Sequence, residues 1–435
     1  MEVMGIAPNL KRSLKFTRLV AVTMGTPLAA SVFLSIIIME TYTSNFPSML
    51  LAVVISTVLA TAAALSYGEL VSIYPSAAGN RVFLKRPMGN VISVTLSFMW
   101  TIIILGAAGV EAYVLGNVLH FLIPLLPSIL WSVISLTVIV VINAVGVEVS
   151  GNFQMGITFF IALSLIAISI VALLTPHVNV NTGGSVNVVD SLTAAAVGVY
   201  FFLGFGRVTT LGEEALDFKR GIPKAMPIAI VMLGIIFMFV SSAIFTRVPI
   251  DLVVSSPVPQ IVLGKYMLNK DSAVVVALVS AVMSFGTFNA GILGTSRLIY
   301  ALGREGTLPS FLGKINSRFF TPTASLIFLY VIALTISVLV YATKSFQVPV
   351  LIAALFDSFM YAFVAYSALW HHRKLQGSEI PFRVRGGTII FLVTSIIFVV
   401  LGVLLILTSP VIVTILTVVG VVVSGVYFYV KLRRK

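Results

Sequence analysis

A long series of apolar segments, each about 20 residues long, constrains the fold of this chain more than any other feature. Inside a bilayer no water is present to bind the backbone, so such segments must pair their own N–H and C=O groups. Apolar residues make up 59% of the 435 residues and charged residues only 9%, whereas soluble domains have roughly 25% charged residues. We therefore predict an all-α polytopic membrane protein, a single transmembrane domain over 1–435. Its 12 transmembrane helices are expected at residues 17–39, 47–73, 90–119, 124–143, 153–175, 191–214, 226–247, 271–303, 322–342, 347–371, 386–408 and 410–431.

The basic residues predict how these helices are oriented. Twenty-two of the 27 Lys and Arg residues fall on one side of the predicted membrane, and four fall on the other. Such an excess marks the cytoplasmic side, so both termini are expected in the cytoplasm of a cell whose cytoplasmic membrane holds the protein. The net charge of +13 is then a topology signal that also attracts anionic lipid, and nucleic-acid binding is not expected. The first span lacks a signal-peptide cleavage site and is expected to be retained.

The inventory of reactive residues argues against an enzyme. The chain has no cysteine, which excludes disulfides and thiolate metal sites. It has only four histidines, and they form no cluster with carboxylates. We expect no metal, no cofactor and no catalytic residues.

Two of the predicted spans are interrupted in the same way. The first span is broken near its middle by Gly25 and Pro27, and the sixth is broken around Gly204 and Gly206. A break at membrane depth must line a cavity or be buried in protein. Interrupted helices at corresponding positions in two halves of a chain indicate the substrate site of a secondary transporter. The alternative for the first span is an ordinary proline kink.

The positions of the breaks predict an internal repeat. Spans one to five (17–175) and spans six to ten (191–371) each begin with a broken helix. Because five is odd, the second set must be inverted relative to the first, which gives a 5+5 inverted repeat with discontinuous helices 1 and 6. The last two helices (386–431) lie outside the repeat and are assigned to packing or oligomerisation. The external loop 248–270 is expected to form a short helix or to be disordered.

An interrupted helix offers binding groups of both signs. Free N–H groups at the start of one half suit a carboxylate, and free C=O groups at the end of the other half suit an ammonium group. Two facing breaks can therefore hold a zwitterionic amino acid with backbone groups alone. Carbonyl acceptors are expected near Thr26 and Pro27, and N–H donors at Ala30 and Ser31. At the second break the candidate residues are Tyr200, Phe201, Phe202, Leu203 and Gly204, with Tyr200 and Phe202 as an aromatic gate.

Four stretches resemble the amino acid–polyamine–organocation permeases, a family with the leucine-transporter fold. The stretches lie in spans one, two, six and eight and read MGTPLAASVF, SYGELVSIYPSAAGNRVFLKRPMG, FFLGFGRVTTLGEEALDFKRGIPKAM and TSRLIYALGREGTLPSFLGKIN. The resemblance covers spans one to ten, and the four stretches occur in the family's order. It implies sodium-independent transport of amino acids or related amines, by proton-coupled symport or by exchange.

The chain departs from the family pattern at three places. The first break reads Ala29-Ala30-Ser31 instead of small-Ser-Gly, which narrows the expected carboxylate site. Ile161 stands about where some members carry a proton-coupling lysine. A glutamate that some members have after the second break aligns near Gly206, with Arg207 beside it.

Three ionisable residues lie at membrane depth, where charges are costly and are treated as functional by default. Glu111 is the leading candidate for a proton carrier, and the alternative is a static pair with Arg207, or pairs with Asp357, that hold helices together. Arg207 is expected to pair with a carboxylate, to bind an acidic substrate or to act as a fixed cation. It holds its proton too strongly to shuttle it. Asp357 is expected to be a structural partner.

The sequence leaves the roles of two further groups of polar residues undecided. Glu213 and Glu214 lie at the cytoplasmic end of the sixth span, where they form either a salt-bridge gate with Arg18 or Lys15 or two solvated acids. In span eight, Ser284, Thr287 and Asn289 lie near a sodium position of related folds, although membrane Ser and Thr residues more often bond to their own backbone.

The leading functional hypothesis is a secondary active transporter of amino acids or related amines. The alternatives are an ion-translocating subunit of a membrane complex and a membrane sensor without transport.

Overall fold

The computed structural model describes residues 10–30, 32–174, 184–217, 219–248, 259–267, 273–343, 347–375 and 380–433. Within these ranges the chain is helical, and the only β-type pairing is the isolated bridge between Leu14 and Ala215. The helices of the first half are α1 (Phe16–Gly25), α2 (Val32–Thr41), α3 (Phe46–Ile73), α4 (Asn80–Met88), α5 (Asn90–Leu122), α6 (Ser128–Val145) and α7 (Val147–Leu174). The second half contains α8 (Val188–Gly198), the 3-10 helices η1 (Val199–Phe202) and η2 (Phe205–Leu211), α9 (Gly221–Arg247), α11 (Pro259–Met267), α12 (Ala273–Arg304), η4 (Ser310–Gly313), α13 (Thr323–Thr343) and α14 (Gln347–Lys374). The chain continues with α15 (Gly387–Thr408) and α16 (Val411–Arg433).

Eleven helical segments of the described chain are long and apolar enough to cross a membrane. They correspond to predicted spans two to twelve, so the prediction of an all-α polytopic membrane protein is confirmed. The predicted first span is divided between α1 and α2, which have 10 residues each. Neither half spans a bilayer alone, because a crossing needs about 20 helical residues. The total of 12 helices and the inverted repeat remain predictions.

Two short helices lie outside the long spans. The helix α4 was not predicted, since its basic, proline-containing sequence has no span-like hydropathy. Helix α11 lies in the loop where a short helix was expected, and the rest of that prediction falls on residues outside the described ranges.

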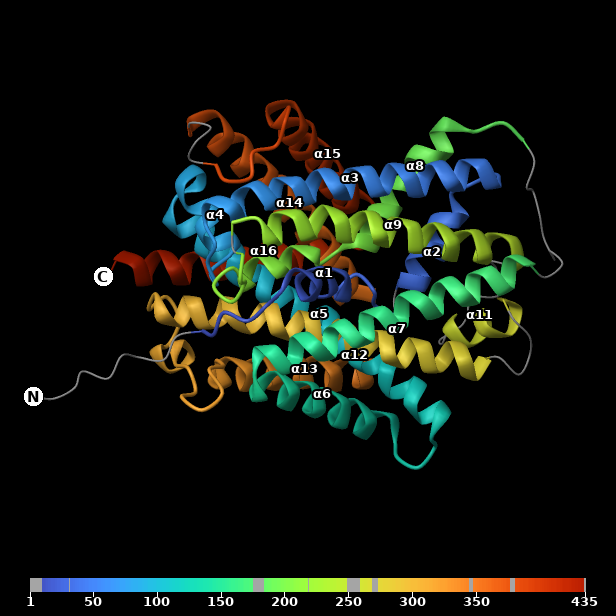
Figure 1. The fold of residues 1–435 in the computed structure, drawn as a ribbon, viewed down its shortest axis with the longest axis horizontal. Coiled ribbons are helices and arrows are strands. Elements are labelled where there is room, and N and C mark those ends of the chain that lie inside the picture. The colour runs from blue at the N-terminus through green and yellow to red at the C-terminus, as the bar shows by residue number, and fades with distance from the viewer. Residues whose placement is uncertain are drawn as a thin grey trace, which may run out of the picture.

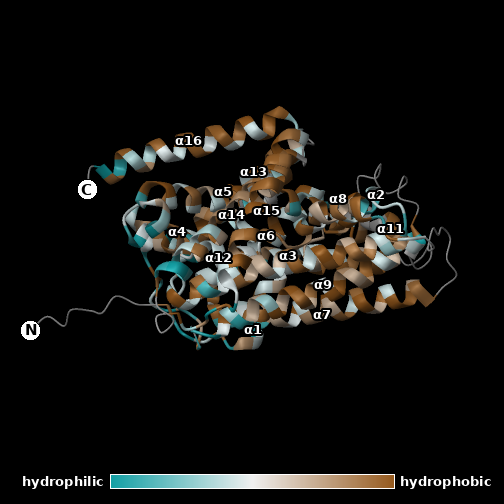
Figure 2. Cartoon of the chain, turned by 90° about the horizontal axis from the view of Figure 1, so that it is seen from above, coloured by the Kyte–Doolittle hydropathy of each residue, from teal (hydrophilic) through white to brown (hydrophobic). Residues whose placement is uncertain are grey.

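The long helices lie side by side along the longest axis of the molecule (Figure 1). Close packing between them depends on small residues, as at Gly234 of α9, where an added Cβ would lie 2.4 Å from Thr57 Cγ2 of α3. Helix α16 lies at the outer edge of the bundle and is the least covered of the long helices (Figure 2). Hydrophilic residues gather at the end of the bundle where α4 and the C-terminus lie (Figure 2), which we call the basic end.

Candidate functional site

The first break separates α1 from α2. Helix α1 ends at Gly25, and α2 begins only at Val32. Pro27 has no N–H and cannot continue the helical hydrogen-bond ladder, and the carbonyls of the last helical turn need other partners where the helix ends. One such partner is Thr287 of α12, whose Oγ1 donates to the Gly25 carbonyl at 3.2 Å. The predicted interruption is therefore present, and it is a change of path over several residues instead of a simple kink.

The second break follows α8. The chain passes through η1, turns at Gly204 in the left-handed conformation (φ +89°) and continues as η2. The Gly204 N–H donates to Tyr361 Oη of α14 at 3.0 Å. Glycine is suited to this turn because positive φ is sterically unfavourable for residues that have a Cβ. This interruption was also predicted correctly.

The two breaks touch each other. A Cβ added at Gly204 would lie only 2.4 Å from Thr26 Cγ2, so these residues, far apart in the sequence, are in direct contact. Among the described residues no hydrogen bond reaches the carbonyl oxygens of Thr26, Pro27 or Leu203. The structure thus brings together the predicted acceptor groups of both breaks and leaves three of them unpaired.

The aromatic residues of the second break divide into two kinds. Phe201 and Phe202 are buried and pack edge-on against Phe237 of α9, with ring centroids 5.6 and 5.4 Å away. Phe202 therefore packs in the core of this structure, and its role as an aromatic gate with Tyr200 remains a prediction. Tyr200 remains partly exposed.

The Ala30 N–H, predicted to bind a substrate carboxylate, is already bonded to the protein. It donates to Glu111 Oε1 of α5 at 3.0 Å. Ser284 Oγ of α12 donates to the same oxygen at 2.6 Å. Glu111 and Ala30 are both buried. The other predicted donor, Ser31, lies outside the described residues.

Arg207 and Asp357 both contact the side chain of Trp100. The Arg207 guanidinium lies 4.5 Å from the centre of the Trp100 ring of α5, and the Trp100 indole donates to Asp357 Oδ1 at 2.6 Å. Arg207 also donates a 3.4 Å hydrogen bond to the Gly204 carbonyl. All three side chains are buried. Glu111 contacts the first break and α12, whereas Arg207 contacts Trp100 and Gly204, and the static roles of both residues remain predictions.

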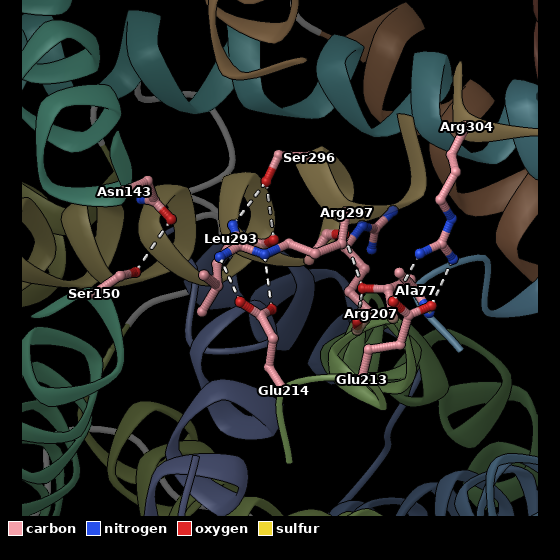
Figure 3. A network of polar contacts seen from close by, with 12 residues as sticks. Ala77, Asn143, Ser150, Arg207, Glu213, Glu214, Leu293, Ser296, Arg297 and Arg304 are labelled. Atoms are coloured by element: carbon pink, nitrogen blue, oxygen red, sulfur yellow. Dashed lines mark hydrogen bonds and ion pairs between the residues drawn. The ribbon is translucent and has the colours of Figure 1, made fainter. Parts of the chain in front are cut away.

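Glu213 and Glu214 form ion pairs with α12 instead of with Arg18. Glu214 binds Arg297 through two hydrogen bonds, Nε to Oε2 at 2.9 Å and Nη2 to Oε1 at 3.1 Å, and both side chains are fully buried. Glu213 binds Arg304 at 2.7 Å near the surface. Figure 3 shows both arginines reaching across to the segment after η2. Arg18 instead lies 3.5 Å from Glu148, so the predicted partner of the two glutamates was wrong.

The sequence contains a pattern from which these ion pairs could have been predicted. Arg297 and Arg304 are seven residues apart, which places them on one face of a helix, opposite two adjacent acids. The backbone completes the contact, because the N–H groups of Ser13 and Leu14 both donate to the Glu214 carbonyl. These contacts join three parts of the chain at the basic end: the residues before α1, the segment after η2, and α12.

Glu213 provides a pH-dependent contribution to stability at the basic end. Burial alone would raise its pKa, but hydrogen bonds from Arg304 and from the Ala77 N–H outweigh burial and hold the pKa below its usual value. A carboxyl with a lowered folded-state pKa stabilises the fold above its unfolded pKa of about 4.3 and loses that contribution as the pH falls through the folded value. We expect Glu213→Gln to lose less thermal stability than the parent between pH 7 and pH 3 (both measured in detergent). An equal loss in the two proteins would contradict this assignment.

A neutral hydrogen-bond network lies behind the first break. Asn289 of α12 accepts from Asn143 and Ser150 and donates to Gln154, and Gln154 donates to Thr158. Thr158 Oγ1 donates to the Ala21 carbonyl of α1 at 3.2 Å. Ile161 is fully buried, and its side chain and that of Gln154 both lie beside Gly286 of α12. The network was not predicted, and Asn289 belongs to it. Within the described ranges no group of three His, Asp or Glu residues is placed to hold a metal ion.

Comparison with known proteins gives a consistent result. The family model described as "Amino acid permease" matches residues 14–429. The cystine/glutamate transporter of Homo sapiens is 26% identical over 336 residues, which covers 74% of this chain and 67% of that protein. The low-affinity putrescine importer PlaP of Escherichia coli K12 is 27% identical over 292 residues, which covers 62% of this chain and 63% of the importer.

The solved structures show similarity of fold. A crystal structure of a mutant manganese transporter from Eremococcus coleocola superposes with a TM-score of 0.61 at 11% identity, covering 100% of this chain and 99% of that one. At this identity the similarity concerns the arrangement of the helices and not the substrate.

Proposed function

Because the chain belongs to the amino acid permease family, we propose that it is a secondary active transporter of amino acids or related amines that works by alternating access. The observation that carries this proposal is the contact between the two helix breaks, with unpaired carbonyls of Thr26, Pro27 and Leu203 beside it. Such carbonyls suit the ammonium group that amino acids and amines share. The named relatives, a cystine/glutamate transporter and a putrescine importer, also handle substrates of these two classes.

The proposal includes the topology predicted from the sequence. Residues 17–175 and 191–371 are the two inverted repeats, and 386–431 form two additional helices. The basic end is the cytoplasmic side of the cell membrane, so that both termini are cytoplasmic. The ion pairs of Glu213 and Glu214 with α12 then form the closed cytoplasmic gate, with Arg18 beside it.

Proton coupling through Glu111 is part of the same proposal. This carboxylate contacts both the first break and α12, so protonation at Glu111 would weaken its hold on the Ala30 N–H. Arg207 and Asp357 are proposed to act as a fixed pair beside the second break.

Uptake into liposomes that contain the purified protein tests the function. We expect saturable uptake or exchange of at least one labelled amino acid or amine, and faster uptake when the outside is more acidic. Glu111→Gln should remove this dependence on the pH gradient. If no amino acid or amine gives saturable uptake, the transporter assignment fails. If Glu111→Gln still concentrates substrate in response to the gradient, Glu111 is not the proton carrier.

A further inference from the structure

A carboxyl group is buried at the end of the bundle opposite the basic end. Glu40 lies in the last turn of α2 and is only 1% exposed. Helix α2 lies beside α8 and α11, away from α4 and the C-terminus (Figure 1, Figure 2). Glu40 directly follows the predicted first span, 17–39, and the transport mechanism proposed above does not use it. In the proposed topology, this end of the bundle is the external one.

The protein does not hydrogen-bond either oxygen of this carboxyl group. Oε1 and Oε2 are both buried and have no partner among the described residues. Thr43 contacts only the backbone of Glu40, because its N–H and its hydroxyl both donate to the Glu40 carbonyl, at 3.1 and 2.8 Å. Buried polar side chains are nearly always paired, so this unpaired carboxyl group requires an explanation.

No basic side chain of the described chain compensates a charge on Glu40. The elements that pack against α2 are α8, α9, α11 and η1. Apart from Lys224, at the far end of α9, the titratable residues of these elements are Asp190, Tyr200, Arg247, Lys265 and Tyr266. Within the described ranges, none of them forms a hydrogen bond or an ion pair with the Glu40 carboxyl group.

The ionised form of Glu40 is therefore unfavourable in this structure. A buried carboxylate is costly when neither a cation nor a hydrogen-bond donor of the protein compensates it. The position in the helix adds to this cost, because the C-terminal end of a helix carries partial negative charge and repels an anion. The neutral carboxyl group fits these surroundings. When α2 moves away from its neighbours, water reaches the group and the ionised form becomes the stable one at neutral pH.

We infer that Glu40 is a proton-binding site at the external end of the bundle, and that this end closes over α2 only when the site is occupied. On closing, one proton from the external water forms the O–H bond of the Glu40 carboxyl group. On opening, this bond breaks and the proton returns to the same side. Glu40 therefore makes closure dependent on the external pH without carrying protons across the membrane, a role different from that proposed for Glu111. The inference rests on the proposed topology and transport function.

A thiol on the buried face of α2 can report whether this end is open. The chain has no cysteine, so Ile36→Cys introduces a single thiol. Ile36 is fully buried and precedes Glu40 by four residues, which places both on the same face of the helix. The purified protein in liposomes is labelled with a membrane-impermeant maleimide at external pH 6 and pH 8, with and without Glu40→Gln. Dividing the two labelling rates cancels the ionisation of the thiol, because both proteins carry the same thiol.

We expect the labelling rate with Glu40 present, divided by the rate with Glu40→Gln, to rise about threefold or more from pH 6 to pH 8. The reason is that release of one proton makes opening up to about tenfold more favourable per pH unit. Asp190→Asn removes a partly exposed carboxyl group of α8 at the same end and is the control, which should leave this rise unchanged. Met39→Cys, at another fully buried residue of α2, is a second reporter if Ile36→Cys does not fold. A ratio that is the same at both pH values would overturn the inference.

Glu40→Leu tests the same inference from the opposite side. An apolar side chain needs no proton to be buried, so labelling of the Ile36→Cys thiol should be slow at both pH values. Labelling of Glu40→Leu as fast as that of the parent at pH 8 would also overturn the inference. Labelling requires no substrate, so a failure of the protein to transport any amino acid or amine would count against the transport function and would leave this test intact.

Discussion

Replacing Arg297 by alanine is expected to destabilise the folded protein by about 3–5 kcal/mol, because it leaves the Glu214 carboxylate buried without its cation. Both side chains are fully buried and joined by two hydrogen bonds. The pair holds the segment after η2 against α12, so its loss also loosens the attachment of residues 13–14 to that segment. The measurement is the thermal unfolding midpoint of the purified protein in detergent.

The neighbouring ion pair provides a matched control. Arg304 and Glu213 connect the same two segments at a distance of 2.7 Å, but their side chains are 43% and 25% exposed. An exposed pair contributes only about 0–1 kcal/mol, so Arg304→Ala should change the midpoint little. Replacing both buried partners by leucine should recover much of the loss caused by Arg297→Ala, since two apolar residues leave no buried charge behind. Equal effects of Arg297→Ala and Arg304→Ala would contradict the assignment.

Gly204→Ala is expected to abolish transport and to destabilise the protein. Two costs add at this position. A residue other than glycine in the left-handed conformation costs about 1–2 kcal/mol. In addition, the new Cβ would lie 2.4 Å from Thr26 Cγ2 and 2.8 Å from Arg207 Nη1, and such overpacking costs about 1–3 kcal/mol more. Relief of the clash must move the two breaks apart. Uptake of the transported substrate and the unfolding midpoint, measured on the same preparation, test this expectation.

Gly386 separates the conformational cost from the steric one. It has a similar left-handed conformation (φ +69°), but a Cβ added there would meet nothing within 4 Å. Gly386→Ala should therefore show only the conformational cost and retain transport. If Gly204→Ala transports as well as Gly386→Ala, the contact between the breaks is not important for function.

The positions of the breaks were predictable because they depend on local chemistry. Pro27 lacks the N–H that a helix needs, and Gly204 adopts a backbone conformation that other residues avoid. Hydrophobic length fixed the long helices in the same way, and the observed bounds of α3, Phe46–Ile73, nearly coincide with the predicted 47–73. The breaks and the long helices can therefore be predicted without knowing which residues pack against them.

The partners of the charged residues were not predictable in this way. Glu111 was expected to carry protons or to form a static pair with Arg207 or Asp357, and its contacts with the Ala30 N–H and with Ser284 were not predicted. Glu213 and Glu214 were expected either to form a gate with Arg18 or Lys15 or to be solvated, whereas the structure pairs them with two arginines of α12. A charged side chain can reach several helices, and the choice among them depends on how those helices are packed.

The sequence by itself therefore determined that this is an all-helical membrane protein with two interrupted helices, and its motifs indicated the permease family. Both conclusions rest on hydropathy, on backbone chemistry and on motif order, which are properties of short segments. Only the tertiary structure decided that the two breaks touch, that the carbonyls of Thr26, Pro27 and Leu203 receive no hydrogen bond from the described residues, and that Glu111 accepts from the Ala30 N–H. These contacts join residues more than 80 positions apart in the chain. They depend on the helix packing that brings such residues together, which short segments do not specify.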